Sequence, residues 1–498
     1  MSAADSLKGS CQQCGQHIQF PSELAGSTID CPACGQGTEL FPFEADPGTS
    51  ATLGDAELLK AFQQPIPRSR VSVVYQIGLV FVAIAMVILP LLYLGLIALA
   101  GWATYHWATD FTSVMGGRGR VAVFRFGAYV APLFAGVALV FFMVKPLFAR
   151  RPQHAQPLAL NPGAEPLLFA FVSRICETVG APYPTRIDVD CNLNAAASFR
   201  RGFGSFFRND LVLTLGLPLV AGLQMNQLAG ILAHEFGHFT QGFGMRLTYI
   251  IRSVNFWFAR VVYERDAWDV ALQEWAEEGE GGSVFIAWVA QIAVWTSRQL
   301  LKLLMFFGHG VGCFMLRQME YDADSYEIKL AGSEVYEACA RRVHVLDHVS
   351  ERAYKTMRVG WNNNRELPED FCAYLDRVDS QIESTHRAKL EDRMGLRKTG
   401  VFDTHPSDGD RIRRARLANE PGVFHLDRPA RELLCCFAVL AKQVTHLHYS
   451  DDLGIPVELA KLMPLVRAMP AAPEQSPLAP DEAQVASLPG SRLKFRKS

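Results

Sequence analysis

The sequence predicts a mainly α-helical membrane protein with a small β-sheet. The first observation is Val71–Ala100, which contains no charged residue and exceeds the about 20 residues that cross the hydrocarbon core of a bilayer. The second is composition, because 49% of the 498 residues are hydrophobic and the mean hydropathy is +0.10, which is high for a soluble protein. The third is the helical periodicity that prevails beyond about residue 155, where only short stretches alternate like strands.

Two Cys-x-x-Cys pairs lie near the N-terminus, Cys11 with Cys14 and Cys31 with Cys34. Four thiolates at this spacing suit tetrahedral zinc. A unit this small cannot bury much core, so the metal would hold it together. We therefore expect residues 1–45 to form a ribbon with one structural zinc ion, which docks a protein partner. Nucleic acid is not expected as a partner, because this segment has one lysine, no arginine and five acidic residues and would repel phosphates.

Residues 46–70 contain several prolines and glycines and are expected to form a linker. Residues 71–149 are expected to hold two transmembrane helices, near residues 76–100 and 127–144, both without charge. Each stretch contains one proline, which transmembrane helices tolerate; two helices buried in a protein core are the alternative. Two crossings leave both flanks on one side of the membrane, and the thiol-rich ribbon favours the cytoplasm for that side.

The sequence His234-Glu235-Phe236-Gly237-His238 lies in an apolar run with helical periodicity. Residues four apart lie on one face of a helix, so both imidazoles can bind one metal ion. Glu235 is about 100° further round the helix than His234, where its carboxylate can reach a water molecule on that metal. This is the His-Glu-x-x-His arrangement of zinc peptidases, and it needs a third ligand from elsewhere in the chain.

Three further segments carry polar residues in a characteristic order. They are Asn194-Ala195 after the strand-like stretch Ile187–Cys191, Glu320 and Asp324 four apart on one helix face, and Thr404-His405-Pro406 followed by Arg411. Together with the histidine motif and the two preceding spans, they make the chain resemble the HtpX-like and CAAX-prenyl-protease-like membrane zinc metallopeptidases. The resemblance covers residues 185–415, and the N-terminal ribbon lies outside the usual family core.

The resemblance implies a zincin-type metallopeptidase domain, mostly helical with a small sheet, over residues 155–450. It implies that Glu320 is the third ligand of a catalytic zinc and that Asp324 supports the ligands from behind. Asp322 and Glu327 are the alternatives to Glu320, although neither occupies the matching position.

The resemblance also assigns the residues around the substrate. His405 and Arg411 match positions that line the site. Asp188–Ala195 matches the edge strand that pairs with the substrate backbone, so Asn194 and Ala195 are expected to contact the substrate.

The segment 243–317 is hydrophobic but interrupted by charges. If His234 and Glu320 share one metal, the chain between them must cross the bilayer an even number of times, which excludes a single crossing. We expect amphipathic helices lying against the membrane, with Arg298 and Lys302 in a polar stripe. Two further spans are the alternative. Residues 465–498 are rich in proline and alanine and are expected to be disordered.

Three protein ligands leave a fourth zinc position for water, whose pKa zinc lowers towards about 7. Glu235 would take the proton and pass it to the leaving amine, and His405 would donate to the developing oxyanion. The sequence thus favours a membrane-anchored zinc metalloendopeptidase that cleaves unfolded or membrane-associated polypeptides in protein quality control. We expect it in a bacterial inner membrane, in contact with lipid, with ribbon and catalytic domain in the cytoplasm.

Two other functions stay open. The chain could be a membrane scaffold with a vestigial metal site, although the intact Glu235 disfavours this, because a pure metal site needs no general base. It could also be a maturation protease for a lipidated or membrane partner, although two firm spans are few for a large intramembrane chamber.

Overall fold

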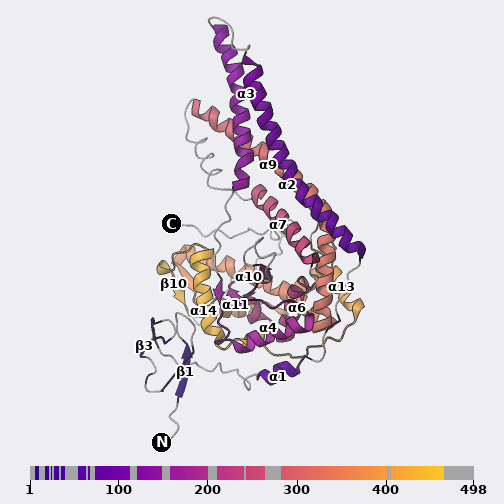
Figure 1. Ribbon diagram of the computed structural model, residues 1–498. Coiled ribbons are helices and arrows are strands. Elements are labelled where there is room, and N and C mark those ends of the chain that lie inside the picture. The colour runs from indigo at the N-terminus through magenta and orange to yellow at the C-terminus, as the bar shows by residue number, and fades with distance from the viewer. Residues whose placement is uncertain are drawn as a thin grey trace.

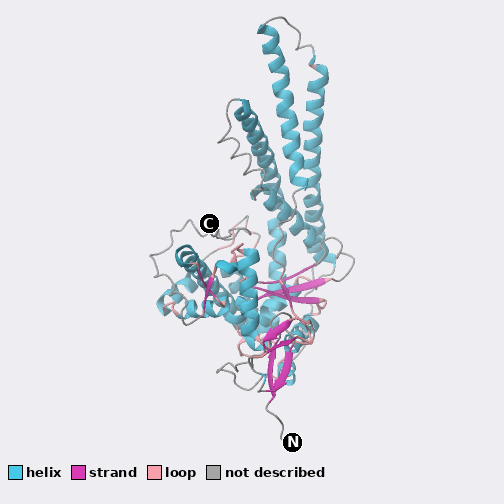
Figure 2. Ribbon diagram, turned by 90° about the vertical axis from the view of Figure 1, so that its left-hand side faces the viewer, coloured by secondary structure: helices cyan, strands magenta, loops and turns pink. Residues whose placement is uncertain are grey.

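The computed structural model shows a mainly helical protein in which a long helical bundle rises from a rounded body (Figures 1 and 2). It describes residues 6–10, 17–21, 24, 27–32, 35–39, 54–62, 66–67, 73–112, 120–148, 157–199, 210–240, 243–263, 282–396, 398–400, 403 and 405–464. Cys11, Cys14 and Cys34 of the expected ribbon lie outside these ranges, as does the expected disordered tail 465–498.

Four short strands near the N-terminus form two antiparallel hairpins. In the first, β1 (Ser6–Ser10) pairs with β2 (His17–Pro21), and in the second, β3 (Thr28–Asp30) pairs with β4 (Gly37–Glu39). Cys31 follows β3 and is 2% exposed, in a small apolar cluster with residues of β2. Two hairpins with a buried thiol between them are compatible with a ribbon.

The body contains one four-stranded sheet in the order β5-β6-β8-β7, made of β5 (Leu158–Ala159), β6 (Arg186–Asp190), β8 (Leu211–Gly216) and β7 (Ala195–Phe199). β6 runs parallel to β8, and β7 runs antiparallel to β8. The expectation that Asp188–Ala195 forms one edge strand is wrong. Its first part lies in the interior strand β6, because Ile187, Asp188 and Val189 are all buried, and only Ala195 belongs to the edge strand β7.

Helices pack with the sheet in one large apolar core, and a smaller apolar cluster contains Tyr336, Met394 and Ile412. The helices of the body are α4 (Pro166–Val179), α5 (Leu217–Gly222), α6 (Met225–Gly237), α10 (Ser333–Asn364), α11 (Phe371–Ser380), α12 (Ser384–Leu396), α13 (Asp408–Ala418) and α14 (Phe437–Leu447). A separate two-stranded sheet is formed by β9 (Glu366–Pro368) and β10 (Lys461–Met463), which run parallel.

The segment before the bundle is not a free linker. It contains α1 (Asp55–Lys60), and Leu58, Phe62 and Ile66 are each 5% exposed or less within the main core. The Phe62 ring lies 4.4 Å from the Phe424 ring, between centroids. The prolines suggested a linker, but apolar residues four apart bind the segment to the body. Because α2 starts soon afterwards, the chain enters the bundle from the side on which the body lies.

The bundle contains α2 (Val73–Asp110), α3 (Arg120–Val144), α7 (Phe243–Tyr263) and α9 (Gly282–Ala331). Among the described residues, three helical stretches are long and apolar enough to cross a membrane, at Tyr75–Asp110, Arg120–Phe148 and Trp288–Ala331. The first two contain the two spans expected from the sequence. A protein with three such helices is a membrane protein.

A buried hydrogen-bond network joins three bundle helices where α3 ends. The Tyr93 hydroxyl donates to the Met143 carbonyl at 2.9 Å and lies 3.1 Å from the Ser297 hydroxyl. Ser297 donates to the Phe142 carbonyl at 3.3 Å, which is free because Pro146, four residues on, has no N–H to offer it. The network thus satisfies carbonyl groups that a lipid environment would leave unpaired.

In the described parts of segment 243–317, the two helices run along the bundle and not across its end. α7 and α9 are antiparallel and stand beside α2 and α3 (Figure 1). Ile251 of α7 packs near Met315 of α9, and Phe258 packs near Leu304. One side of each helix is buried in the bundle, whereas α9 also leaves large apolar side chains such as Trp295 and Phe314 exposed. Helix α7 leads away from His234, and α9 leads back to Glu320. The chain therefore returns to the side of the metal-binding residues, as a shared metal requires.

Candidate functional site

Helix α6 presents the histidine motif from the centre of the body. Gln224 caps its first turn, with the Gln224 N–H donating to the Gln227 side chain at 3.1 Å. One face of the helix is fully buried against the core, through Leu228, Ala229, Leu232, Ala233 and Phe236. The other face carries His234 and His238, whose rings are 4.9 Å apart between centroids and nearly perpendicular. The helical spacing therefore places both imidazoles together, as expected.

Helix α9 crosses α6 at close range because α6 has glycines where the helices meet. A Cβ at Gly237 would lie 3.0 Å from the Tyr326 ring, and a Cβ at Gly230 would lie 3.2 Å from the Glu327 side chain. Both distances are shorter than ordinary contacts, so a larger residue would push the helices apart. This approach brings the acidic face of α9 to the histidines.

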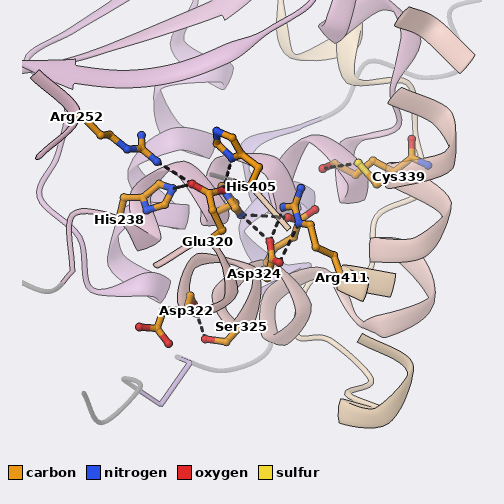
Figure 3. Close-up of polar contacts among 12 residues, drawn as sticks. His238, Arg252, Glu320, Asp322, Asp324, Ser325, Cys339, His405 and Arg411 are labelled. Carbon is orange, nitrogen blue, oxygen red and sulfur yellow. Dashed lines mark hydrogen bonds and ion pairs between the residues drawn. The ribbon is translucent and has the colours of Figure 1, made fainter. Parts of the chain in front are cut away.

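Glu320 of α9 lies close to both histidines, and Figure 3 shows it beside His238. Its Oε2 lies 3.5 Å from His234 Nε2 and its Oε1 lies 3.9 Å from His238 Nε2. One ligand atom of each residue lies within 4.8 Å of the others. Glu320 is 4% exposed, so two imidazoles and a carboxylate converge away from bulk water.

These three residues fit zinc. Two histidine nitrogens and one carboxylate are a known donor set for catalytic zinc, and they leave one position for a further ligand. A second group of possible ligands, His234 with Asp324 and Glu327, lies on the opposite side of the His234 ring. There Asp324 is already paired with Arg411, at 3.0 Å from Nε and 2.5 Å from Nη2. Arg411 thus engages both oxygens of Asp324, whereas Arg252 engages only Oε1 of Glu320 and leaves Oε2 beside His234, so the metal fits the first group.

The two histidines differ in their affinity for protons. Burial opposes the protonation of His234, but the carboxylates of Asp324 and Glu320 outweigh it and raise the pKa of His234 to about 10. Burial, assisted by the positive charges of His234 and Arg252, lowers the pKa of His238 to about 3. One proton is therefore held at His234, whereas His238 is neutral and ready to donate its lone pair.

Glu235 lies between the metal-binding residues and the sheet. Its Oε2 accepts a hydrogen bond from the Ala197 backbone N–H of β7 at 3.3 Å. Burial raises the pKa of Glu235 above its usual value, so the carboxylate has a stronger affinity for a proton than in water. The edge strand and the predicted general base thus lie side by side.

The other expected residues reach the site to different degrees. His405 Nδ1 lies 3.4 Å from Glu320 Oε2, with the His405 side chain 67% exposed, and Arg411 binds Asp324 behind the ligands (Figure 3). Asn194 and Ala195 lie at the start of the edge strand, but the Asn194 carbonyl accepts from the Gly216 N–H at 2.7 Å and so faces the sheet interior.

Sequence reasoning missed three residues of this region, and it named a fourth, Glu327, only as an alternative to Glu320. Ala197 is the edge residue that contacts Glu235. Arg252 of α7 donates to Glu320 Oε1 at 2.8 Å; a cation within an apolar helix is a signal that could have identified it. Arg317 donates to the Asp403 carbonyl at 2.8 Å and so holds the loop before His405. Glu327 Oε2 lies 3.7 Å from His234 Nδ1. Its spacing of seven residues from Glu320 was the one sequence signal that both lie on the same face of the helix.

Comparison with known proteins gives a match of the family model for peptidase family M48 to residues 168–418, which is half of the chain. The matched range contains the edge strand, the histidine motif, Glu320 and the loop with His405. No curated protein and no solved structure matches the chain.

Proposed function

The chain belongs to peptidase family M48, and on this premise we propose that it is an HtpX-like, membrane-anchored zinc metalloendopeptidase that cleaves unfolded or membrane-associated polypeptides. The observation that carries the proposal is the convergence of His234, His238 and Glu320 beside Glu235 and the edge strand β7. The family resemblance inferred from the sequence motifs is thereby confirmed, and the metallopeptidase activity follows from the family.

The edge strand β7 is suited to hold an extended polypeptide. The Asn194 carbonyl accepts a hydrogen bond from the Gly216 N–H of β8. Asn194 and every second residue after it in β7 therefore direct their backbone groups towards β8. Because backbone groups alternate along a strand, Ala195, Ala197 and Phe199 direct theirs to the open edge. A substrate strand that pairs there is recognised mainly by its backbone, which fits a broad choice of polypeptides.

Zinc held by the three ligands would supply an activated water molecule and polarise the scissile carbonyl. Glu235, hydrogen-bonded to Ala197 at the strand edge, would accept the proton at Oε2 or Oε1 and deliver it to the leaving amine. The exposed side chain of His405 lies with its Nδ1 3.4 Å from Glu320 Oε2, and it would donate a hydrogen bond to the oxyanion. Asp324, clamped by Arg411, would keep the His234 ring in place.

The experiment is the Glu235→Gln variant, assayed with zinc on casein-like unfolded protein and on membrane protein fragments. We expect a loss of at least about 10²-fold in cleavage with unchanged zinc content, because Glu235 is not a ligand. The matched control is Glu351→Gln, a surface carboxylate of α10 that pairs with Lys355. Equal digestion by wild type and Glu235→Gln would refute the proposal and favour a scaffold with a vestigial metal site.

We also propose that the catalytic domain and the N-terminal ribbon both face the cytoplasm of a bacterial inner membrane and serve quality control. The burial of Leu58, Phe62 and Ile66 in the body supports a common side for both parts. Six described cysteines of the body are free thiols, namely Cys176, Cys191, Cys339, Cys372, Cys435 and Cys436, which fits a reducing compartment. Cysteine labelling of the loop between α2 and α3 from outside the cell tests the orientation, and protection of that loop would contradict it.

The ribbon is proposed to hold a second, structural zinc through Cys11, Cys14, Cys31 and Cys34 and to dock a protein partner. Buried Cys31 supports this. Elemental analysis should find two zinc ions per chain in the wild type and one in Cys31→Ser. A single zinc ion in both proteins would contradict the ribbon without affecting the catalytic site.

A further inference from the structure

Asn255 of α7 holds a primary amide inside the bundle without a hydrogen-bond partner. Its Oδ1 and Nδ2 atoms are both buried, and neither is paired with any described residue. The surroundings are apolar, since Ile251 and Leu316 belong to one buried cluster. Unpaired amide atoms weaken the contact between α7 and α9, because nothing compensates for their loss of water. Buried polar groups in this condition are rare, and each needs a physical explanation.

Gly312 of α9 leaves room beside this amide. A Cβ at Gly312 would lie 3.6 Å from Asn255 Nδ2, 3.8 Å from Leu316 Cδ1 and 3.9 Å from Ile251 Cγ2. These are ordinary contact distances, so a methyl group would fit without displacing any neighbour. Close packing of α7 against α9 therefore does not require a glycine here, although glycine weakens a helix. The unfilled space lies directly at a polar side chain.

The amide also lies close to the metal-binding residues. Arg252, about one turn before Asn255 on α7, donates to Glu320 Oε1 at 2.8 Å (Figure 3). Gly312 precedes Glu320 by eight residues, which corresponds to about 12 Å along α9. An extended chain covers this distance in about four residues. A polypeptide held at Asn255 can therefore present a bond about four residues away to the predicted zinc.

We propose that the contact between α7 and α9 at Asn255 and Gly312 binds a peptide group of membrane-embedded polypeptide substrates. A primary amide has two donors and one acceptor, and so it complements a backbone C=O and N–H. Peptide groups that lose their helical partners within a membrane are strongly unfavourable until they find new ones. Asn255 offers such a partner, and the substrate in turn pairs the amide that the protein leaves unsatisfied.

Entry of the substrate requires α7 and α9 to separate locally, and the bundle is best suited to this at Asn255. Further along the bundle, Tyr93 and Ser297 are hydrogen-bonded to each other and to carbonyl groups of α3. Opening that part would break satisfied hydrogen bonds, whereas opening at Asn255 breaks none that the amide makes. The inference rests on the proposed peptidase function, and it specifies how membrane polypeptides are recognised in addition to the strand edge.

The test measures kcat and KM for two substrates with the full-length protein in detergent. One is a single-span membrane protein fragment, and the other is a soluble peptide with the same cleaved sequence, truncated before the position that would reach Asn255. In Asn255→Leu, which keeps the approximate shape, KM for the membrane fragment should rise about 3–20-fold, as expected for one hydrogen bond lost in an apolar environment. Its kcat and the cleavage of the truncated peptide should equal those of the wild type.

A second variant and a control accompany this measurement. Gly312→Ala fills the space beside the amide with a methyl group that fits, so it should preserve the fold and raise KM for the membrane fragment in the same direction. The matched control is Gln299→Leu, because Gln299 is an amide on the exposed side of α9; its KM for both substrates should be that of the wild type.

Thermal unfolding separates substrate binding from a structural role. The midpoint of metal-free Asn255→Leu should lie above that of the wild type, because the substitution removes buried polar atoms that have no partner. A lower midpoint would overturn the inference, since it would mean that the amide is already satisfied, for example by a bound water molecule.

Two kinetic results would also overturn the inference. One is an unchanged KM for the membrane fragment in Asn255→Leu, and the other is an equal loss with the truncated peptide, which indicates general damage to the site. If wild type cleaves neither substrate, the proposed function fails as well. If wild type cleaves both and the variants do not differ from it, the proposed function stands and only the inference fails.

Discussion

Zinc binding to this site should release one proton, and the affinity should therefore depend steeply on pH. The carboxylates of Asp324 and Glu320 raise the pKa of His234 to about 10, whereas metal binding requires the neutral ring. At pH 7 a group with that pKa is protonated by about 10³ to 1. The apparent affinity should accordingly rise about tenfold per pH unit from pH 7 and level off near pH 10. His238 adds no proton, because burial lowers its pKa to about 3.

Isothermal titration calorimetry at pH 7.5 in buffers of different ionisation enthalpy counts the protons released per zinc. We expect a value close to one for the catalytic site, measured in a protein whose ribbon cysteines are replaced. The stability of the metal-free protein should change in the opposite direction. Because the pKa of His234 is higher in the folded state than its ordinary 6.5, this contribution is complete below about pH 6.5 and is lost as the pH rises to about 10. Zinc binding without proton release would refute the reasoning.

Three substitutions test the surroundings of the site, each followed by denaturant or thermal unfolding in detergent. Phe62→Ala should destabilise the body by about 3–5 kcal/mol, because the ring is buried against Phe424; a cost below about 1 kcal/mol would restore the linker interpretation. Tyr93→Phe removes two hydrogen bonds at the end of α3 and should cost about 0.6–2 kcal/mol, with no effect expected on zinc affinity. Arg411→Leu leaves Asp324 buried without its partner and should cost about 3–5 kcal/mol, most of which Asp324→Asn in the same chain should restore.

Local spacing predicted the part of the site that one helix supplies. His234, Glu235 and His238 are neighbours on α6, so helical periodicity sufficed to place them. Glu320 comes from another helix, and only the order of motifs connected it to the histidines. The contact that unites them depends on Gly230 and Gly237, whose meaning becomes visible only when α9 lies against α6.

Segments with two possible environments were harder to predict. Prolines in 46–70 suggested a linker, yet Leu58, Phe62 and Ile66 are buried because the body offers an apolar surface for them. Charges in 243–317 suggested helices on the membrane surface, yet α7 and α9 each bury one side, including Phe258 and Leu304, against α2 and α3. In both cases the choice depends on a partner surface distant in the sequence.

Helix α9 is one continuous rod of 50 residues, anchored in the bundle near Leu301 and carrying Glu320 towards its other end. The two residues are about 28 Å apart along the axis, so a tilt of about 2° about Leu301 moves Glu320 by about 1 Å. A displacement of that size can change a catalytic rate by about 10²-fold. Since transmembrane helices tilt when the hydrocarbon thickness around them changes, we expect cleavage rates to differ between bilayers of short-chain and long-chain lipids.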